Sequence, residues 1–372
     1  MKSESFATPQ GTENFRKRFE GKTSPEHFRN DSLLSNSLYL SSLGLGTYLG
    51  DPDDETDNQV EKMARLAVQS GVNVIDTAIN YRYQRAERSI GRSLHQMFTQ
   101  DKINRNEIVI STKGGFIPFN GKEPETPDLY IQKNLIDTEL AFEEEIVAGC
   151  HCISPSYLQS QINQSLVNLH LSTIDIYYVH NPETQLREVS RNQFYKRIQA
   201  AFKLLEENVA QGKIRCYGTA TWTGFLANPK TKDYLSLKDL IQIAHDVGGT
   251  QHHFKAIQLP YNLAMPEALL HRNQELNGQW VSLLTAAQNQ GFIVMSSASL
   301  LQGRLAETLP EAVHHLFKGL KTPAQKSIQF VRSTPGITTA LVGMKSQAHL
   351  KENTETLQHE LEPESITSVF EN

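Results

Sequence analysis

Four polar side chains in the first half of the chain have the types and spacing of an acid–base site: Asp76, Tyr81, Lys113 and His180. Three of them directly follow apolar runs that predict short buried strands, at residues 72–75, 108–112 and 174–179. Tyr81 lies in the loop five residues after Asp76. A carboxylate, a phenol, an ammonium and an imidazole at successive strand ends can be aimed into one cleft. Together they could protonate an oxygen, which is the chemistry of carbonyl reduction.

The four side chains suggest a division of labour. A free tyrosine has a pKa of about 10, which is high for an acid that acts at neutral pH. We expect the ammonium of Lys113 to lower the pKa of Tyr81 by favouring the phenolate. Asp76 would pair with Lys113, and His180 would donate a hydrogen bond to the substrate oxygen, where charge develops in the transition state. Each residue alone also has a structural explanation, but their joint order favours the functional one.

Strands and helices alternate along the part of the chain that positions these side chains. The apolar runs predict eight strands, at residues 43–47, 72–76, 108–112, 174–179, 214–219, 256–259, 292–296 and 338–342. Helical periodicity is found at residues 57–70, 86–97, 135–147, 154–169, 193–211, 237–247 and 281–289. Short apolar strands of this kind are typical of parallel sheets buried on both faces. The pattern predicts an α/β fold, a (β/α)8 TIM barrel. An open doubly wound sheet is less favoured, because the first unit lacks Gly-x-Gly-x-x-Gly.

The remaining segments flank or interrupt this barrel, which we place at residues 38–360. Residues 1–37 form an N-terminal extension, which we interpret as a peripheral or partly disordered arm. A long insertion at about residues 115–153 follows the third strand, where loops commonly shape the substrate pocket or form a lid. Residues 361–372 are a C-terminal tail.

Composition excludes several classes of function. The 372 residues include 36 Lys and Arg and 41 Asp and Glu, a formal charge of −5 without a basic stripe, so we expect no nucleic-acid partner. No apolar run reaches the roughly 18 residues of a membrane span, and the N-terminus has no apolar signal core. Three cysteines fit a reducing, cytoplasmic compartment. The spacing of Cys150-His151-Cys152 is too tight for a usual zinc site, so we expect no metal.

Several short motifs occur in one order between about residues 40 and 356. They include Gly44-Leu45-Gly46-Thr47, Asp76-Thr77-Ala78 with Tyr81, Ser111-Thr112-Lys113, Asp175 with His180 and Pro182, Gln258 with Tyr261-Asn262, and Val342-Gly343 through Asn353. Together they resemble the aldo-keto reductase family. The resemblance implies a (β/α)8 barrel that binds NADP(H) across its mouth and reduces a small-molecule aldehyde or ketone. It also implies that Asp76, Tyr81, Lys113 and His180 are the catalytic tetrad.

The same resemblance implies a set of cofactor contacts. They are Gly46, Thr47, Tyr48, Asp76, Ala220, Thr221, Gln258, Ser297, Ala298, Ser299, Leu300, Gly303, Gly343, Lys345, Ser346, His349, Glu352 and Asn353. Gln258 would hold the nicotinamide carboxamide, and residues 343–353 would grip the adenosine phosphate. Lys345 and Ser346 are suited to a 2′-phosphate, because a cation and a hydroxyl bind anionic oxygens, and this favours NADP over NAD.

Three departures from the family pattern occur, and the first two keep a second function open. Ala220-Thr221 replaces the usual Ser-Asn, Ser297 replaces a tyrosine that stacks on the nicotinamide, and the insertion lengthens the chain between Lys113 and His180. Trp222 could compensate for the lost stacking, although Trp222 and Tyr83 could equally be packing residues. The alternative is an NADP(H)-binding redox-sensing or regulatory protein with slow turnover. An unrelated barrel hydrolase or lyase would need a metal cluster or paired carboxylates at strand ends, which the sequence lacks.

Overall fold

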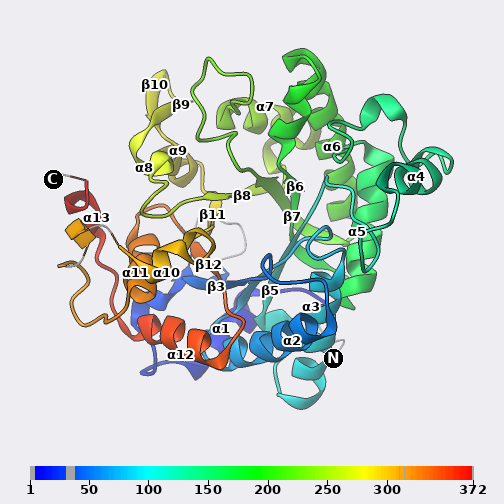
Figure 1. Ribbon diagram of the computed structural model, residues 1–372. Coiled ribbons are helices and arrows are strands. Elements are labelled where there is room, and N and C mark those ends of the chain that lie inside the picture. Colours follow the sequence, from blue (N-terminus) through cyan, green and yellow to red (C-terminus); the bar gives the residue numbers. More distant parts are fainter. Residues whose placement is uncertain (1–4, 31–37, 310, 314, 371–372) are drawn as a thin grey trace.

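The centre of the molecule is a closed barrel of eight parallel strands, seen in Figure 1. The computed structural model describes residues 5–30, 38–309, 311–313 and 315–370. In order around the barrel, the strands are β3 (Leu43–Gly46), β4 (Val74–Asp76), β5 (Val109–Gly114), β6 (Ile174–His180), β7 (Ile214–Ala220), β8 (Phe254–Pro260), β11 (Ile293–Ser297) and β12 (Thr339–Gly343), which pairs back with β3. The prediction of a (β/α)8 barrel is confirmed.

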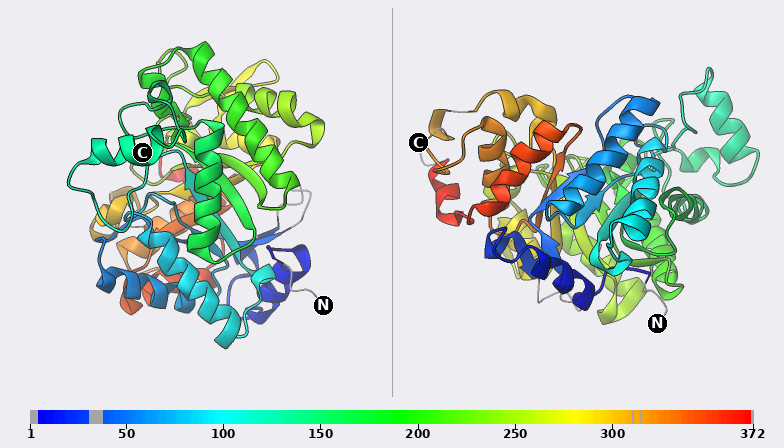
Figure 2. Two further views of the ribbon diagram at one scale, coloured as in Figure 1. Left: turned by 90° about the vertical axis from the view of Figure 1, so that its right-hand side faces the viewer. Right: turned by 90° about the horizontal axis from the view of Figure 1, so that it is seen from below.

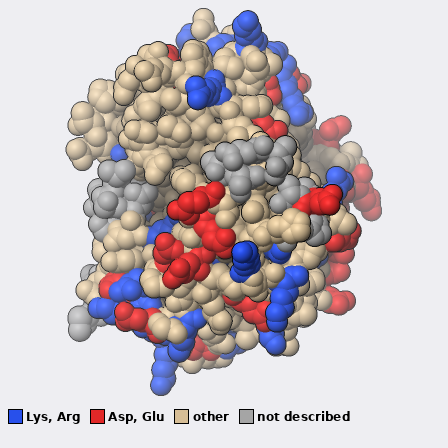
Figure 3. Space-filling model, turned by 90° about the vertical axis from the view of Figure 1, so that its left-hand side faces the viewer, with Lys and Arg blue, Asp and Glu red and all other residues tan. Residues whose placement is uncertain are grey.

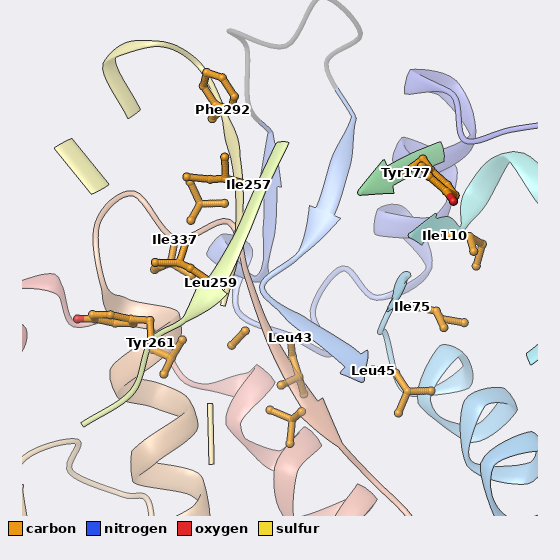
Figure 4. Packing of buried hydrophobic residues seen from close by; sticks show 14 of the residues in the cluster. Leu43, Leu45, Ile75, Ile110, Tyr177, Ile257, Leu259, Tyr261, Phe292 and Ile337 are labelled. Carbon is orange, nitrogen blue, oxygen red and sulfur yellow. The ribbon is translucent and has the colours of Figure 1, made fainter. Parts of the chain in front are cut away.

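The strands are apolar on both faces because each face meets a different part of the core. Successive side chains on a strand point to opposite sides of the sheet. One set fills the barrel and includes Val74, Val109, Ile176, Tyr178, Ala256, Met295 and Leu341. The other set packs outwards against the helices, as Figure 4 shows for Leu43, Leu45, Ile75, Ile110, Ile257 and Leu259. Asp76 and Gln258 follow Val74 and Ala256 by two residues, so they share the inner face.

Helices surround the barrel and connect its strands (Figure 1). The longer ones are α2 (Asp54–Gln69), α3 (Arg85–Gln100), α5 (Pro155–Leu169), α6 (Arg191–Ala210), α7 (Leu237–Gly248), α9 (Leu283–Asn289), α11 (Pro323–Ser333) and α12 (Gln347–Glu355). Local sequence fixes their ends: Asp53 caps α2 by accepting from the amide of Thr56 at 2.8 Å, and Gly71, with φ +103°, follows its last turn. Three short helices lie in the second half of the chain: α8 (Glu267–Leu270), α10 (Arg304–Glu307) and α13 (Pro363–Ser368).

One expected helix is shorter than predicted, because a hairpin takes its first residues. Residues 281–282 belong to β10 (Gln279–Ser282), which pairs antiparallel with β9 (Arg272–Leu276). The apolar residues of this segment gave no alternation strong enough to reveal the hairpin before α9 begins.

The N-terminal extension is a packed part of the fold rather than a peripheral arm. Helix α1 (Pro9–Arg18) buries Phe15 completely, and Figure 2 shows α1, in dark blue, against the body of the molecule. The backbone amide of Ala7 donates to Asp175 at 2.7 Å, and a two-stranded sheet of β1 (Phe28–Asn30) and β2 (Tyr39–Ser41) follows. Ala7 and Leu40 join the cluster inside the barrel and close its amino-terminal end. Residues 1–4 and 31–37 of the predicted extension lie outside the described residues.

The insertion after β5 has its own small core, and the helix predicted at residues 135–147 is wrong. The segment forms α4 (Pro127–Ile131), a π-helical turn at residues 132–136 and a 3-10 turn at 143–145. Glu139, with φ +55°, breaks the helical path between the two turns. Six buried side chains hold the segment together: Ile117, Ile131, Leu135, Ala141, Cys152 and Tyr157. In Figures 1 and 2 this segment protrudes from the body of the molecule around α4.

One face of the molecule shows mixed charge. Figure 3 shows lysines and arginines among aspartates and glutamates on the face that lies to the left in Figure 1. Within the described ranges, every helix is too short or too polar to span a lipid bilayer.

Candidate active site

The four predicted acid–base side chains come together at the carboxyl ends of β4, β5 and β6. Asp76 is the last residue of β4, Lys113 lies near the end of β5, and His180 is the last residue of β6. Tyr81 reaches the same place from the loop after β4. The Nζ of Lys113 lies 4.8 Å from the centroid of the Tyr81 ring, and the rings of Tyr81 and His180 have centroids 5.9 Å apart.

Lys113 and Asp76 form a buried ion pair beneath Tyr81. The ammonium, which has no exposed surface, donates to Asp76 Oδ2 at 2.6 Å and to the carbonyl of Thr77 at 2.8 Å. The other carboxylate oxygen accepts from Ser111 Oγ at 2.7 Å and from Gln258 Nε2 at 2.9 Å. Burying two charges is favourable only where further hydrogen bonds satisfy them, and here both charges have such partners.

Burial sets the protonation state of Tyr81. It raises the pKa of the phenol, and the opposing effect of the Lys113 ammonium does not cancel this rise. The ammonium of Lys113 lowers the pKa of Tyr81 as expected, but burial outweighs this effect, so the net pKa lies above its ordinary value. For Lys113 itself, burial disfavours the charge, but Asp76 and Tyr81 together hold the pKa above its ordinary value. At neutral pH the site presents a protonated phenol above a charged ammonium.

His180 is a neutral imidazole in this setting. Burial lowers its pKa well below the ordinary value, and the charge of Lys113 acts in the same direction. Its Nδ1 is buried and has no hydrogen-bond partner among the described residues. The ring of Phe116 packs edge-on against it at 5.0 Å between centroids. A neutral imidazole still carries one N–H and can donate it to an oxygen.

The loop that carries Tyr81 is held in an unusual backbone conformation. Arg82, Tyr83 and Gln84 have φ of 48°, 57° and 72°, which costs of order 1–3 kcal/mol for each such residue, so the conformation persists only where neighbouring contacts impose it. Here the buried guanidinium of Arg82 pairs with Asp57 of α2, and Gln84 Nε2 donates to the carbonyl of Phe119 at 3.1 Å. These contacts fix the turn, so Tyr81 is directed by a rigid loop.

A cavity of about 690 Å³ extends from this cluster across the barrel mouth. All but one of the residues predicted as cofactor contacts line this cavity. Those that line it are Gly46, Thr47, Tyr48, Asp76, Ala220, Thr221, Gln258, Ser297, Ala298, Ser299, Leu300, Gly303, Gly343, Lys345, His349, Glu352 and Asn353. The exception is Ser346, which lies outside this lining. Its Oγ accepts from the amide of His349 at 3.2 Å and so caps α12. Lys113 is not part of the lining; it contacts Asp76 and Tyr81, which both line the cavity.

Sequence reasoning missed part of the lining. The additional residues include Leu49, Val60, Asn80, Phe116, Asn181, Gln302, Ala306 and Met344. Asn80 and Asn181 directly neighbour Tyr81 and His180, which was a usable signal. Phe116 carried none, because only the folded insertion brings it to the cavity. Of the two aromatic residues left undecided, Trp222 lines the cavity, whereas Tyr83 packs against Phe119 at 5.9 Å between ring centroids.

The two ends of the cavity differ chemically. The end near α12 carries the ionisable side chains of Lys345, His349 and Glu352. The end near Tyr81 is bordered by Tyr48, Leu49 and Trp222, which are 57%, 38% and 44% exposed. One end can therefore bind an anionic group, and the other suits a planar or apolar one.

The Cys150-His151-Cys152 segment takes part in the fold next to this site. His151 is fully buried and its ring is hydrogen-bonded on both nitrogens. Across the ranges that the structure describes, no group of three or more His, Cys, Asp or Glu side chains is arranged to hold a metal ion.

Known proteins share this sequence pattern. The model of the aldo/keto reductase family matches residues 42–245. The chain is 27% identical over 197 residues to the NADH-specific methylglyoxal reductase of Escherichia coli, and the alignment covers 50% of each protein. It is 23% identical over 361 residues to the protein tas of the same bacterium, with 90% of this chain and 94% of the relative covered. The chain spans about half the length of the first two curated relatives that it matches.

Solved structures share the fold. An aldo/keto reductase from Klebsiella pneumoniae, in complex with NADP and acetate, superimposes with a TM-score of 0.61 at 19% identity, over 90% of this chain and 91% of that chain. The glycerol dehydrogenase of Gluconobacter oxydans gives a TM-score of 0.63 at 18% identity, over 93% and 94% of the two chains. At these identities the likeness concerns the barrel and its connections.

Proposed function

This chain belongs to the aldo/keto reductase family of oxidoreductases, and on that premise we propose that it reduces an aldehyde or ketone with NADPH, using Tyr81 as the proton donor. The observation that carries the proposal is the assembly of a protonated phenol, a neutral imidazole and a buried ammonium–carboxylate pair at one end of an extended cavity.

The cavity residues fit an NADP(H) molecule. The buried Oγ1 of Thr221 has no hydrogen-bond partner among the described residues, so it can bind an amide group that enters the cavity. Gln258 uses its amide nitrogen on Asp76, which leaves its oxygen to accept from a carboxamide. At the other end, Lys345 and the amino-terminal turn of α12 can bind a phosphate. Bound there, the nicotinamide would supply a hydride to the carbonyl carbon.

The residues of this chain would handle the proton and the charge on oxygen. Tyr81 donates its phenolic proton to the carbonyl oxygen and becomes a phenolate. The ammonium of Lys113, 4.8 Å from the ring centroid, stabilises that phenolate. The neutral imidazole of His180 donates a hydrogen bond to the same oxygen before charge develops, which lowers the barrier without further reorganisation. Asp76 keeps Lys113 charged and fixed in place.

Exposed aromatic residues would receive the organic part of the substrate. Tyr48 packs edge-on against Tyr81 at 5.0 Å between ring centroids, and Trp222 and Phe116 line the same end of the cavity. Together with Leu49 they favour a carbonyl compound with a planar or apolar body. Trp222 and Ser297, the position without the usual aromatic ring, line the same cavity.

A binding and turnover assay tests this function. Fluorescence titration with NADPH and with NADH measures affinity, and stopped-flow oxidation of each nucleotide with a panel of aldehydes measures hydride transfer. We expect tight NADPH binding and oxidation by at least one aldehyde. Tyr81→Phe should retain the affinity and lose about 100-fold or more in turnover. Equal turnover in this variant would overturn the role of Tyr81 as the acid.

The same assay separates the alternative function. Ala220 and Ser297 line the cavity in place of the family's usual side chains, and this substitution predicts weaker binding of the nicotinamide. Tight NADPH binding without oxidation by any carbonyl compound would favour a redox-sensing protein. The complete acid–base cluster supports the enzyme instead, because a sensor needs no proton donor.

A further inference from the structure

The insertion contributes a buried side chain to the neighbourhood of the candidate catalytic histidine. His151, near the end of the insertion, directs its Nε2 at the backbone carbonyl oxygen of His180, 2.7 Å away. The ladder between β5 and β6 ends at Gly114 and Val179, one residue before His180. The carbonyl of His180 is therefore the first one beyond that ladder, and it is bound by the side chain of His151.

The hydrogen bonds around His151 fix which nitrogen carries the proton. Gln185 Nε2 lies 2.8 Å from His151 Nδ1 and 3.2 Å from the His151 carbonyl oxygen. An amide nitrogen is only a donor, so Nδ1 must accept and the proton must reside on Nε2. The orientation of Gln185 is fixed in turn by the guanidinium of Arg197, which donates to its amide oxygen. Burial lowers the pKa of His151 to about 4, so the ring is neutral over the physiological range.

The same network ties His151 to the body of the insertion. Arg197 of α6 also donates to the backbone carbonyls of Glu144 at 2.5 Å and Glu145 at 3.4 Å. The two ends of the insertion are joined by backbone bonds, from Ile117 to Cys150 and from Cys152 to Gly115, each at 2.8 Å. Hydrogen bonds thus hold the insertion both where its two ends meet and at its 3-10 turn.

The packing around His180 leaves little room for another arrangement. Phe116 lies edge-on to both histidine rings, at 4.9 Å from His151 and 5.0 Å from His180. A Cβ on Gly115 would lie 3.0 Å from His151 Nε2 and 3.0 Å from the His180 oxygen, and its φ of +136° is in the glycine region. The backbone at Gly115 therefore lies so close to His151 and His180 that it leaves no room for a side chain.

We propose that His151 is a positioning residue: through its Nε2–H bond to the His180 carbonyl, the insertion holds the His180 imidazole in line with the substrate oxygen beside Tyr81. This rests on the proposed function for its kinetic consequence, although the hydrogen bond itself can be tested without turnover. Loosening the His180 peptide would misplace the donor, and misplacement by about 1 Å can cost about 100-fold in rate.

The first test compares His151→Ala with a matched variant elsewhere. His27 is also fully buried, and its ring bonds Ser42 at 3.0 Å and the carbonyl of Gly71 at 2.9 Å, near the closed end of the barrel. Both Ala variants should lower the melting temperature. His151→Ala should lower kcat about 10- to 100-fold and leave the Kd for NADPH within about two-fold, whereas His27→Ala should leave kcat within about two-fold. Equal kcat in the two variants would overturn the proposal.

A second pair of variants covers the possibility that His151→Ala does not fold. His151→Gln can still donate from its amide to the His180 carbonyl and should recover most of kcat. Gln185→Met, which is close to isosteric, frees the tautomer of His151 and should lower kcat without changing the Kd for NADPH. Failure of rescue together with an unaffected Gln185→Met would count against the proposal.

Histidine-selective ¹H–¹⁵N spectra decide the geometry independently of activity. The wild type should show His151 as the Nε2–H tautomer, and His151→Gln and Gln185→Met should shift the ring signals of His180 while His27→Ala does not. An Nδ1–H tautomer at His151, or unmoved His180 signals, would overturn the proposal. Absence of turnover in the wild type would instead count against the proposed function, and the spectra would still judge the positioning.

Discussion

Removing one partner of the buried pair Asp76–Lys113 should cost about as much stability as removing both. In Asp76→Asn the ammonium of Lys113, with no exposed surface, keeps only neutral acceptors such as the Thr77 carbonyl. Breaking a buried pair in this way costs about 3–5 kcal/mol, and we expect about 4 here. In Lys113→Met the Asp76 carboxylate retains Ser111 and Gln258 as donors, so we expect the lower end, about 3 kcal/mol.

The double variant separates charge from packing. If the two losses were additive, Asp76→Asn combined with Lys113→Met would lose about 7 kcal/mol, but no unpaired charge remains buried, and we expect only about 4 kcal/mol. The coupling free energy of about 3 kcal/mol therefore measures the interaction between Asp76 and Lys113. All three variants should lose about 100-fold or more in turnover, because Tyr81 loses either the ammonium beside it or the carboxylate that keeps this ammonium charged and in place. All three variants are then inactive, while the double variant is no less stable than Asp76→Asn alone.

The assay is urea unfolding followed by far-ultraviolet circular dichroism, because Trp222 and Trp280 are both exposed and report poorly on the core. The matched control is Asp175→Asn, which breaks another buried pair, with Arg105 at 2.7 Å, near the amino-terminal end of β6. It should cost a similar free energy and keep kcat within about three-fold. Additive losses in the double variant, or an Asp76→Asn protein as stable as the wild type, would refute the reasoning.

Three further variants or conditions test other parts of the structure. Lys345→Ala should weaken NADPH binding by about 10- to 100-fold, from the loss of a charge-assisted hydrogen bond, and NADH binding much less; equal effects in a titration would remove its phosphate role. Trp222→Ala should raise the Kd for NADPH or the KM for aromatic aldehydes by about 2- to 10-fold, and unchanged constants would show that the indole only covers the cavity mouth. Acid should destabilise the fold, because the pKa values of buried His27 and His151 are lowered to about 3 and about 4. A histidine whose pKa is lower in the folded protein than in the unfolded chain, where it is about 6.5, stabilises the fold above that pH, and this stabilisation is lost as the pH falls. At pH 4.5 the two groups together should lower the free energy of unfolding by roughly 5 kcal/mol. Urea unfolding at pH 7.5 and 4.5 measures this, and a flat dependence would contradict the neutral burial of both rings.

Some structural features could not be predicted because they depend on contacts between distant segments. Phe15 and Ala7 are isolated apolar residues in a polar stretch, and only the open end of the barrel gives them a surface to cover. The insertion offered a plausible helical pattern, yet a small core of its own bent it into turns. Neither outcome is a local property of the chain.

The sequence by itself determined the barrel, the order of its strands and the four polar side chains at their ends. Short apolar strands buried on both faces leave a pattern that is readable residue by residue, and a polar residue that ends such a run must lie at the rim. The tertiary structure decided how those side chains behave. Burial, and not the neighbouring ammonium, dominates the pKa of Tyr81. Gln258 meets Asp76 across 182 residues, and His151 meets His180 across 29, because closure of the barrel and of the insertion brings them together. Those contacts depend on packing in three dimensions, which local pattern does not encode.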